Sequence, residues 1–154
     1  MKAFNFPLES LRVLRKQREQ TAQQRYARAL AQCDDAVRGW QLAEAELNAG
    51  HAHFTRELAA GAAAARLVQL RTWCTVLEIR RNEVAAALAE ARRLVNDAFR
   101  LLTAAARERE ALDRFHDKSQ HLWQRAFHAD EQKMFDELAV QRQSAANSEK
   151  SRLN

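Results

Sequence analysis

The chain has 154 residues but only three glycines and one proline, too few turn-forming residues for a fold of many short elements. Its 25 basic and 20 acidic residues give a net charge of +5. The excess lies in residues 1–30, and the rest of the chain is balanced. Composition therefore favours a few long helices, with a basic N-terminal segment that could be attracted to an acidic protein, a nucleic acid or an anionic membrane.

The first long segment without helix breakers follows Pro7, the only proline. Proline is accepted in a first helical turn because its missing N–H would have no intrahelical partner. Beyond it, apolar residues recur at alternating steps of four and three, the spacing of a helix that packs along one stripe. We therefore predict a helix over residues 8–58. The stripe comprises Tyr26, Leu30, Cys33, Val37, Trp40, Leu47, His51, Phe54 and Leu58, with Ala43 filling the break at Glu44.

A second apolar stripe predicts another helix over residues 67–143. The intervening residues 59–66, centred on Gly61, predict the reversal, and a short connection makes two helices antiparallel neighbours. We therefore expect an all-α fold: one antiparallel coiled-coil domain over residues 1–143, followed by a disordered Ser/Asn-rich tail at 144–154. The second stripe comprises Leu67, Leu70, Cys74, Leu77, Arg81, Val84, Leu88, Ala91, Val95, Ala98, Leu102 and Ala105.

The unequal helix lengths predict an unpaired stretch. A reversal near residue 62 pairs position i with a position near about 125 − i. The second helix then extends past the start of the first from about residue 120. Its apolar residues indicate a binding partner or self-association, unless Met134, Phe135 and Leu138 pack on the first helix. The apolar residues of this stretch are Trp123, Phe127, Met134, Phe135 and Leu138.

The sequence offers little support for a catalytic site or a metal site. The sequence has no Gly-rich phosphate loop, nucleophile elbow or HExxH motif, and two paired helices form no concave site. We expect no enzyme activity and no cofactor. His51, His53 and Cys74 near the predicted turn could suggest a metal, but residues two apart lie on different helix faces and structural zinc needs four ligands. Without a CxxC pair, Cys33 and Cys74 indicate helix-interface residues in a reducing compartment.

Nucleic acid remains an alternative partner for the basic segment, because its arginines could neutralise phosphates. Residues 12–28 contain no asparagine of the base-reading kind, however, so we expect no nucleic-acid partner. Residues 15–25 offer almost no apolar face for a membrane surface. We see no signal peptide and no run near the ~18 apolar residues of a membrane span, and expect a soluble, cytoplasmic protein.

Two stretches resemble the two ends of one protein family. Residues 4–15, FNFPLESLRVLR, resemble the F-x-F-x-L-E-x-L-x-x-x-R pattern that opens the flagellar export protein FliJ. Residues 130–139, DEQKMFDELA, resemble its C-terminal E-Q-K-x-x-D-E-x-A signature; we call them the signature segment. The resemblance covers roughly residues 4–142 and implies a coiled coil similar to the stalk of rotary ATPase gamma subunits.

The resemblance also implies a role. It points to a non-enzymatic component of the flagellar type III export apparatus, in the cytoplasm at the inner face of the membrane beneath the basal body. The implied partners are the hexameric export ATPase, the export gate protein of the membrane and export chaperones. The related YscO-type proteins of virulence injectisomes are the alternative, and self-association also stays open.

Individual residues follow from the same resemblance. Trp73 and Leu77 lie at the height along the helix pair where the resemblance implies contact with the export gate. Trp73 could instead pack beside Phe54. Arg80 and Val84 stand where the resemblance leads us to expect apolar residues and histidine. For the ATPase ring, the resemblance implies steering charges, polar contacts and apolar contacts. The steering charges are Arg12, Arg15, Arg18 and Arg25. The polar contacts are Gln132, Lys133, Asp136 and Glu137, and the apolar contacts are Phe135 and Leu138.

Overall fold

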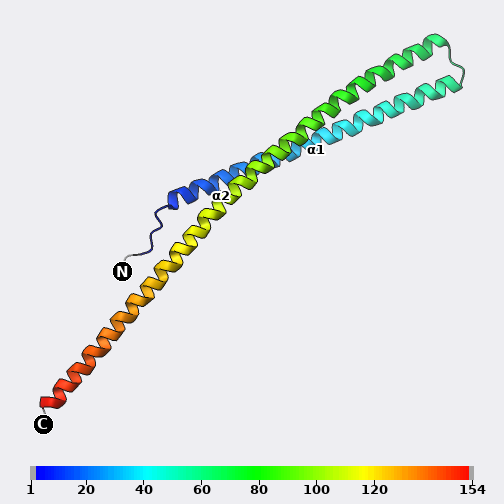
Figure 1. Ribbon diagram of the computed structural model, residues 1–154. Helices are drawn as coiled ribbons and strands as arrows, with labels where there is room; N and C mark the ends of the chain where they lie inside the picture. The colour runs from blue at the N-terminus through cyan, green and yellow to red at the C-terminus, as the bar shows by residue number, and fades with distance from the viewer. Residues whose placement is uncertain (1–2, 153–154) are drawn as a thin grey trace. The chain divides into compact units, whose positions relative to one another are not determined.

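Two long helices make up most of the chain. The computed structural model describes the backbone of residues 3–152 and the side chains of residues 3–142. Helix α1 spans Glu9–Ala59 and helix α2 spans Ala64–Arg152, with no strand among the described residues. The helices run in opposite directions from the turn that joins them and pack against each other (Figure 1). The predicted fold class, an antiparallel helical hairpin, is confirmed.

The turn is a glycine-dependent helix stop. Gly61 has a φ of 73°, a left-handed conformation that only glycine adopts without strain. Its N–H donates to the carbonyl of Leu58 at 3.2 Å, and the N–H of Ala62 donates to the carbonyl of Glu57 at 3.1 Å. These two bonds form a Schellman motif, which satisfies carbonyls that the end of a helix leaves unpaired. The reversal therefore lies at the glycine from which it was predicted.

The helix bounds differ from the predicted ones at all four ends. The first helix begins and ends one residue later than expected, at Glu9 and Ala59. The second begins at Ala64 rather than residue 67, because alanine and arginine at 64–66 favour helix. It also continues to Arg152, so helical backbone occupies 144–152, where a disordered tail was expected. That segment has no glycine or proline; residues 153–154 of the expected tail lie outside the described residues.

Contacts within the chain divide it into two compact units rather than the one domain expected. We call Gln17–Ala106, which contains the turn, the hairpin unit, and the described parts of Met1–Lys16 and Arg107–Asn154 the terminal unit. Each position of a long helix pair touches only its neighbours along the pair, so distant stretches share no common core.

The α2 side of the hairpin unit follows the predicted stripe. Every member of that stripe is buried or half-buried, and Leu70, Cys74, Leu77 and Leu88 are only 5–7% exposed. The register is also confirmed. Tyr26 lies against Phe99 with ring centroids 5.7 Å apart, consistent with a reversal near residue 62.

The α1 side of the hairpin unit follows the predicted stripe only in part. Leu47 is buried, and Tyr26, Cys33, Val37, Trp40 and Phe54 are half-buried. Ala43 is buried as expected, but Ala29 is buried where the stripe placed Leu30, and Leu30 and Leu58 are 39% and 54% exposed. Small residues permit close approach of the helices, so the larger side chains of α2 fill the space between them. The predicted stripe ranked positions by hydrophobicity and so placed Leu30 where Ala29 packs. The small residues recur every seventh position: Ala22, Ala29, Ala36, Ala43 and Gly50.

Candidate protein-binding surfaces

An aromatic cluster fixes the start of the chain to α2 in the terminal unit. Phe6 is only 5% exposed and lies against Phe115 and His116, with ring centroids 5.7 and 5.0 Å apart. Phe4 contacts His116 at 5.7 Å and Trp123 at 5.9 Å. Edge-to-face and tilted contacts of this kind stabilise beyond the area they bury. Both phenylalanines of the N-terminal motif therefore hold the start of the chain against α2. The sequence stripes did not reveal this role because residues 4–6 precede the helix.

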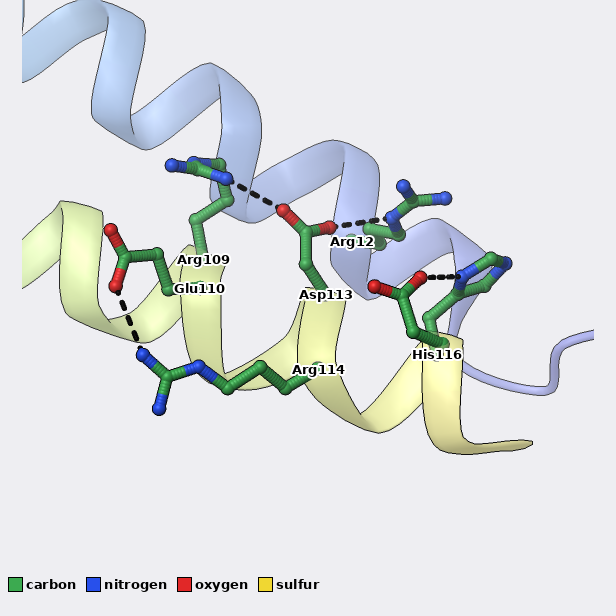
Figure 2. Close-up of polar contacts among 7 residues, drawn as sticks. Arg12, Arg109, Glu110, Asp113, Arg114 and His116 are labelled. Carbon is green, nitrogen blue, oxygen red and sulfur yellow. Dashed lines mark hydrogen bonds and ion pairs between the residues drawn. The ribbon is translucent and has the colours of Figure 1, made fainter. Parts of the chain in front are cut away.

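Charged side chains continue the interface beside this cluster. Figure 2 shows the Asp113 carboxylate between Arg12 of α1 and Arg109 of α2, with N–O distances of 2.7 and 2.6 Å. The hydrogen bond from Arg12 lowers the pKa of Asp113, helped by the bond from Arg109. The hydrogen bond to Asp113 in turn raises the pKa of Arg12. Both groups therefore stay charged at neutral pH, and their ion pair links the helices.

The four arginines expected to steer a partner fall into two groups. Arg12 pairs with Asp113, and Arg15 pairs with Glu108, so both connect α1 to α2. Arg18 and Arg25, in the hairpin unit, are exposed and make no ion pair with any residue that the structure describes. Only the second pair presents uncompensated charge to a partner.

The signature segment lies on a stretch of α2 that nothing in the described chain covers. Residues 128–142 are all exposed, including the six signature residues expected to contact a partner. Met134, Phe135 and Leu138 are 62%, 68% and 47% exposed, so the alternative that they pack against the first helix is wrong. The six are Gln132, Lys133, Phe135, Asp136, Glu137 and Leu138.

The face of α2 that contacts Phe4 and Phe6 continues into the uncovered residues 128–142. Trp123, expected to be unpaired, is half-buried beneath Phe4 and stacks on Phe127, with ring centroids 5.3 Å apart. Met134 and Leu138 follow Phe127 at seven and eleven residues, spacings that keep all three on one helix face. The unpaired stretch thus begins after Phe127, later than predicted, and presents an apolar face without a partner.

A second exposed apolar surface lies near the turn. Trp73 is 55% exposed and borders a shallow pocket with Arg66, Thr72 and Val76. It therefore faces solvent and is not buried beside Phe54. Leu77, by contrast, is 5% exposed within the helix pair and cannot contact a partner directly. The neighbouring Val68, Val76 and Ile79 are 66%, 49% and 54% exposed and were missed, because they lie off the predicted stripe.

The described residues contain neither a cluster of side chains that could hold a metal ion nor a helix that could span a membrane. Near the turn, His51 lies 3.4 Å from Glu78, and Cys74 is buried in the helix pair. Within residues 3–142, no three histidine, cysteine, aspartate or glutamate side chains come together in a way that could hold a metal ion. Neither of the two helices, over its described residues, has an apolar stretch long enough to cross a membrane.

The fold and these surfaces define an antiparallel coiled-coil protein whose exposed side chains suit contacts with other proteins. The family model described as FliJ, flagellar FliJ protein, matches residues 4–148, nearly the whole chain. The chain therefore belongs to the flagellar FliJ family, a non-enzymatic component of flagellar protein export, and the resemblance seen at both chain ends is confirmed. Neither a curated protein nor a solved structure matches the chain.

Proposed function

We propose that this chain binds the ring of the hexameric flagellar export ATPase through its terminal unit and organises that ring without catalysing a reaction. The observation that carries the proposal is the uncovered stretch 128–142, which contains the signature segment and an apolar face without a partner. Exposed apolar helix faces of this kind are stable in water only when they are small or become covered. Family membership in flagellar export supports the identity of the partner.

The proposed contact divides the work among the residues. Phe135 and Leu138, with Met134, provide the apolar contacts. Arg18 and Arg25 raise the rate of encounter with an acidic partner surface. Arg12 and Arg15 act indirectly, because their ion pairs hold α1 against α2. The polar contacts are Gln132, Lys133, Asp136 and Glu137.

A second proposed contact lies near the turn. Trp73, an exposed aromatic residue beside further exposed apolar side chains, suits a binding hot spot for the export gate protein. Leu77 contributes only by supporting the helix from within the pair. In this proposal the protein works at the cytoplasmic face of the membrane beneath the flagellar basal body. Export chaperones are further proposed partners, to which no surface is assigned.

The test is to mix the purified full chain with the cognate export ATPase. Hexamer formation is followed by sedimentation velocity and ATP hydrolysis by phosphate release. We expect more hexamer and faster hydrolysis than with the ATPase alone. The absence of both effects, with an ATPase that is active by itself, contradicts the proposal. A pull-down of the purified cytoplasmic part of the gate protein tests the second contact, with Trp73→Ala as the variant and Leu42→Ala, an equally exposed apolar side chain on α1, as the control.

A further inference from the structure

Two exposed leucines of the hairpin unit lie outside both proposed contacts. Leu94 and Leu101 are 42% and 58% exposed, although they follow each other by one heptad along α2. Residues seven apart lie on the same face of a coiled-coil helix, so the two leucines form a short apolar row beside the buried stripe. A row at heptad spacing is what a further helix contacts when it packs against a helix pair.

An ion pair elsewhere in the unit identifies the α1 residues on the same side. Glu46 of α1 and Arg80 of α2 lie 3.3 Å apart, bridging the two helices. On α2, Leu94 and Leu101 lie two and three heptads after Arg80. On α1, Arg25 lies three heptads before Glu46. Because the helices are antiparallel, Arg25 comes to lie beside Leu101. The Tyr26–Phe99 ring contact shows that the register holds there.

The two edges of this leucine row differ in charge. On the α1 edge, Arg25 and Arg28 are neighbours on the helix surface, both exposed and without an ion pair to any described residue. On the α2 edge, Arg93 pairs with Glu90 at 2.6 Å and with Asp97 at 2.9 Å, and the exposed Arg100 balances the second carboxylate, so this edge carries no net charge. The surface is therefore apolar along its middle and positive along one edge only.

We propose that this surface, formed by Arg25, Arg28, Leu94 and Leu101, binds an amphipathic helix of a partner protein, whose apolar stripe covers the leucines. Carboxylates along one edge of that helix face the two arginines. The spacing of the leucines selects a helix as the binding element, since a helix presents side chains at the same period. Nucleic acid does not fit, because phosphates gain nothing from a row of exposed leucines.

A second copy of the chain fits this surface poorly. A twofold contact presents the same patch on both subunits. Such a contact would bring two sets of uncompensated arginines to one interface, and the patch itself contains no carboxylate to pair with them. A separate acidic helix removes this repulsion, so charge complementarity favours a different protein as the occupant.

The experiment measures binding of two synthetic amphipathic peptides to the full chain by fluorescence anisotropy. Both peptides carry the same leucine stripe; one has glutamates along one edge and the other has lysines at those positions. We expect the glutamate peptide to bind at least roughly tenfold more tightly. The double variant Leu94→Gln with Leu101→Gln should weaken this binding by a similar factor. Arg28→Glu should weaken binding of the glutamate peptide and strengthen binding of the lysine peptide.

The matched control is Ile79→Gln, which removes an equally exposed apolar side chain from α2 in the same unit. It should leave peptide binding unchanged, and circular dichroism should show the same helicity for all variants. Equal binding of the two peptides, or an equal loss in the control, overturns the proposal. So does sedimentation that shows a dimer of the chain abolished by the double leucine variant, because the surface would then be a contact between copies. None of these measurements depends on the export ATPase.

Discussion

The Asp113 carboxylate on α2 accepts a hydrogen bond from Nε of Arg12 on α1, with the two atoms 2.7 Å apart. Arg109 donates to the other oxygen of the same carboxylate (Figure 2). This bridge joins the helices in the unit that also carries the signature segment. Ionic links supplement the apolar contacts here, and the stability of the terminal unit should therefore depend on pH in a specific direction.

Acidification should weaken the terminal unit. The pKa of Asp113 is lowered in the folded chain, chiefly by the hydrogen bond from Arg12. A carboxyl group whose pKa is lowered by folding stabilises the folded chain at pH values above its unfolded-state pKa. That contribution is lost as the pH falls from about 4 through the folded-state pKa. Asp113→Asn should remove this part of the pH dependence. Thermal unfolding between pH 7 and pH 3 measures it, and an unchanged acid dependence in Asp113→Asn contradicts the assignment.

The N-terminal phenylalanines should protect the start of α1 from opening. Phe6→Ala removes the most buried ring of the aromatic cluster, and the first turns of α1 lose their anchor. We expect amide hydrogen exchange at residues 9–16 to accelerate by roughly tenfold or more. Amides around Ala43 in the hairpin unit serve as the internal reference and should not change. Equal acceleration in both regions would mean that Phe6 supports the whole chain instead.

The two glycines inside α1 should respond differently to alanine. A Cβ at Gly39 would meet only Val84, at an ordinary 3.8 Å, so Gly39→Ala should raise the free energy of unfolding by about 0.5–1 kcal/mol through helix propensity. A Cβ at Gly50 would lie 2.9 Å from Cδ1 of Leu77, which must move to accommodate it. Urea unfolding should show a smaller gain, or a loss, for Gly50→Ala. Equal gains for both variants would mean that the helices are not closely packed at Gly50.

Trp73 and Leu77 should separate binding from stability. Leu77 is buried in the helix pair, so Leu77→Ala should lower the free energy of unfolding by about 2 kcal/mol or more. Trp73 is exposed, and Trp73→Ala should change stability by no more than about 0.5 kcal/mol. Urea unfolding followed by circular dichroism measures both. A large loss of stability for Trp73→Ala would show that it packs against the pair and would weaken the proposed gate contact.

Charge reversal should separate steering from structure among the four N-terminal arginines. Arg18→Glu with Arg25→Glu should slow association with the export ATPase, most at low salt, and leave the fold intact. Arg12→Glu with Arg15→Glu should also lower the melting temperature, because both residues pair with carboxylates of α2. Stopped-flow association and thermal unfolding of the two double variants make the comparison. Equal melting temperatures would contradict the structural role of Arg12 and Arg15.

Spacing and turn chemistry were sufficient to predict the helices, the reversal at Gly61 and the α2 side of the interface. These features are local, since they depend on heptad periodicity and on one residue with access to positive φ. The α1 side was predicted only in part. Whether Ala29 or Leu30 packs inward depends on how closely the helices approach, and that distance is a property of both helices together.

The candidate site was also predicted only in part, because contacts across the interface depend on both helices together. The sequence indicated that Phe135 and Leu138 lack a partner, because this follows from the difference in helix length. It did not indicate that Arg12 and Arg15 are already paired, since a charge run looks the same whether or not carboxylates face it across the interface. The roles of Phe4 and Phe6 were missed because they precede the helix, where periodicity carries no information.

The proposed contact with the export ATPase depends most on the uncovered stretch of α2. The direct measurement is the dissociation constant of the full chain for the assembled ATPase, compared between Phe135→Gln with Leu138→Gln and the matched variant Val68→Gln with Ile79→Gln. All four side chains are exposed, so neither variant should change the melting temperature. The first should weaken binding by at least roughly tenfold and the second should not change it. Equal affinity of all three proteins for an active ATPase would contradict the account.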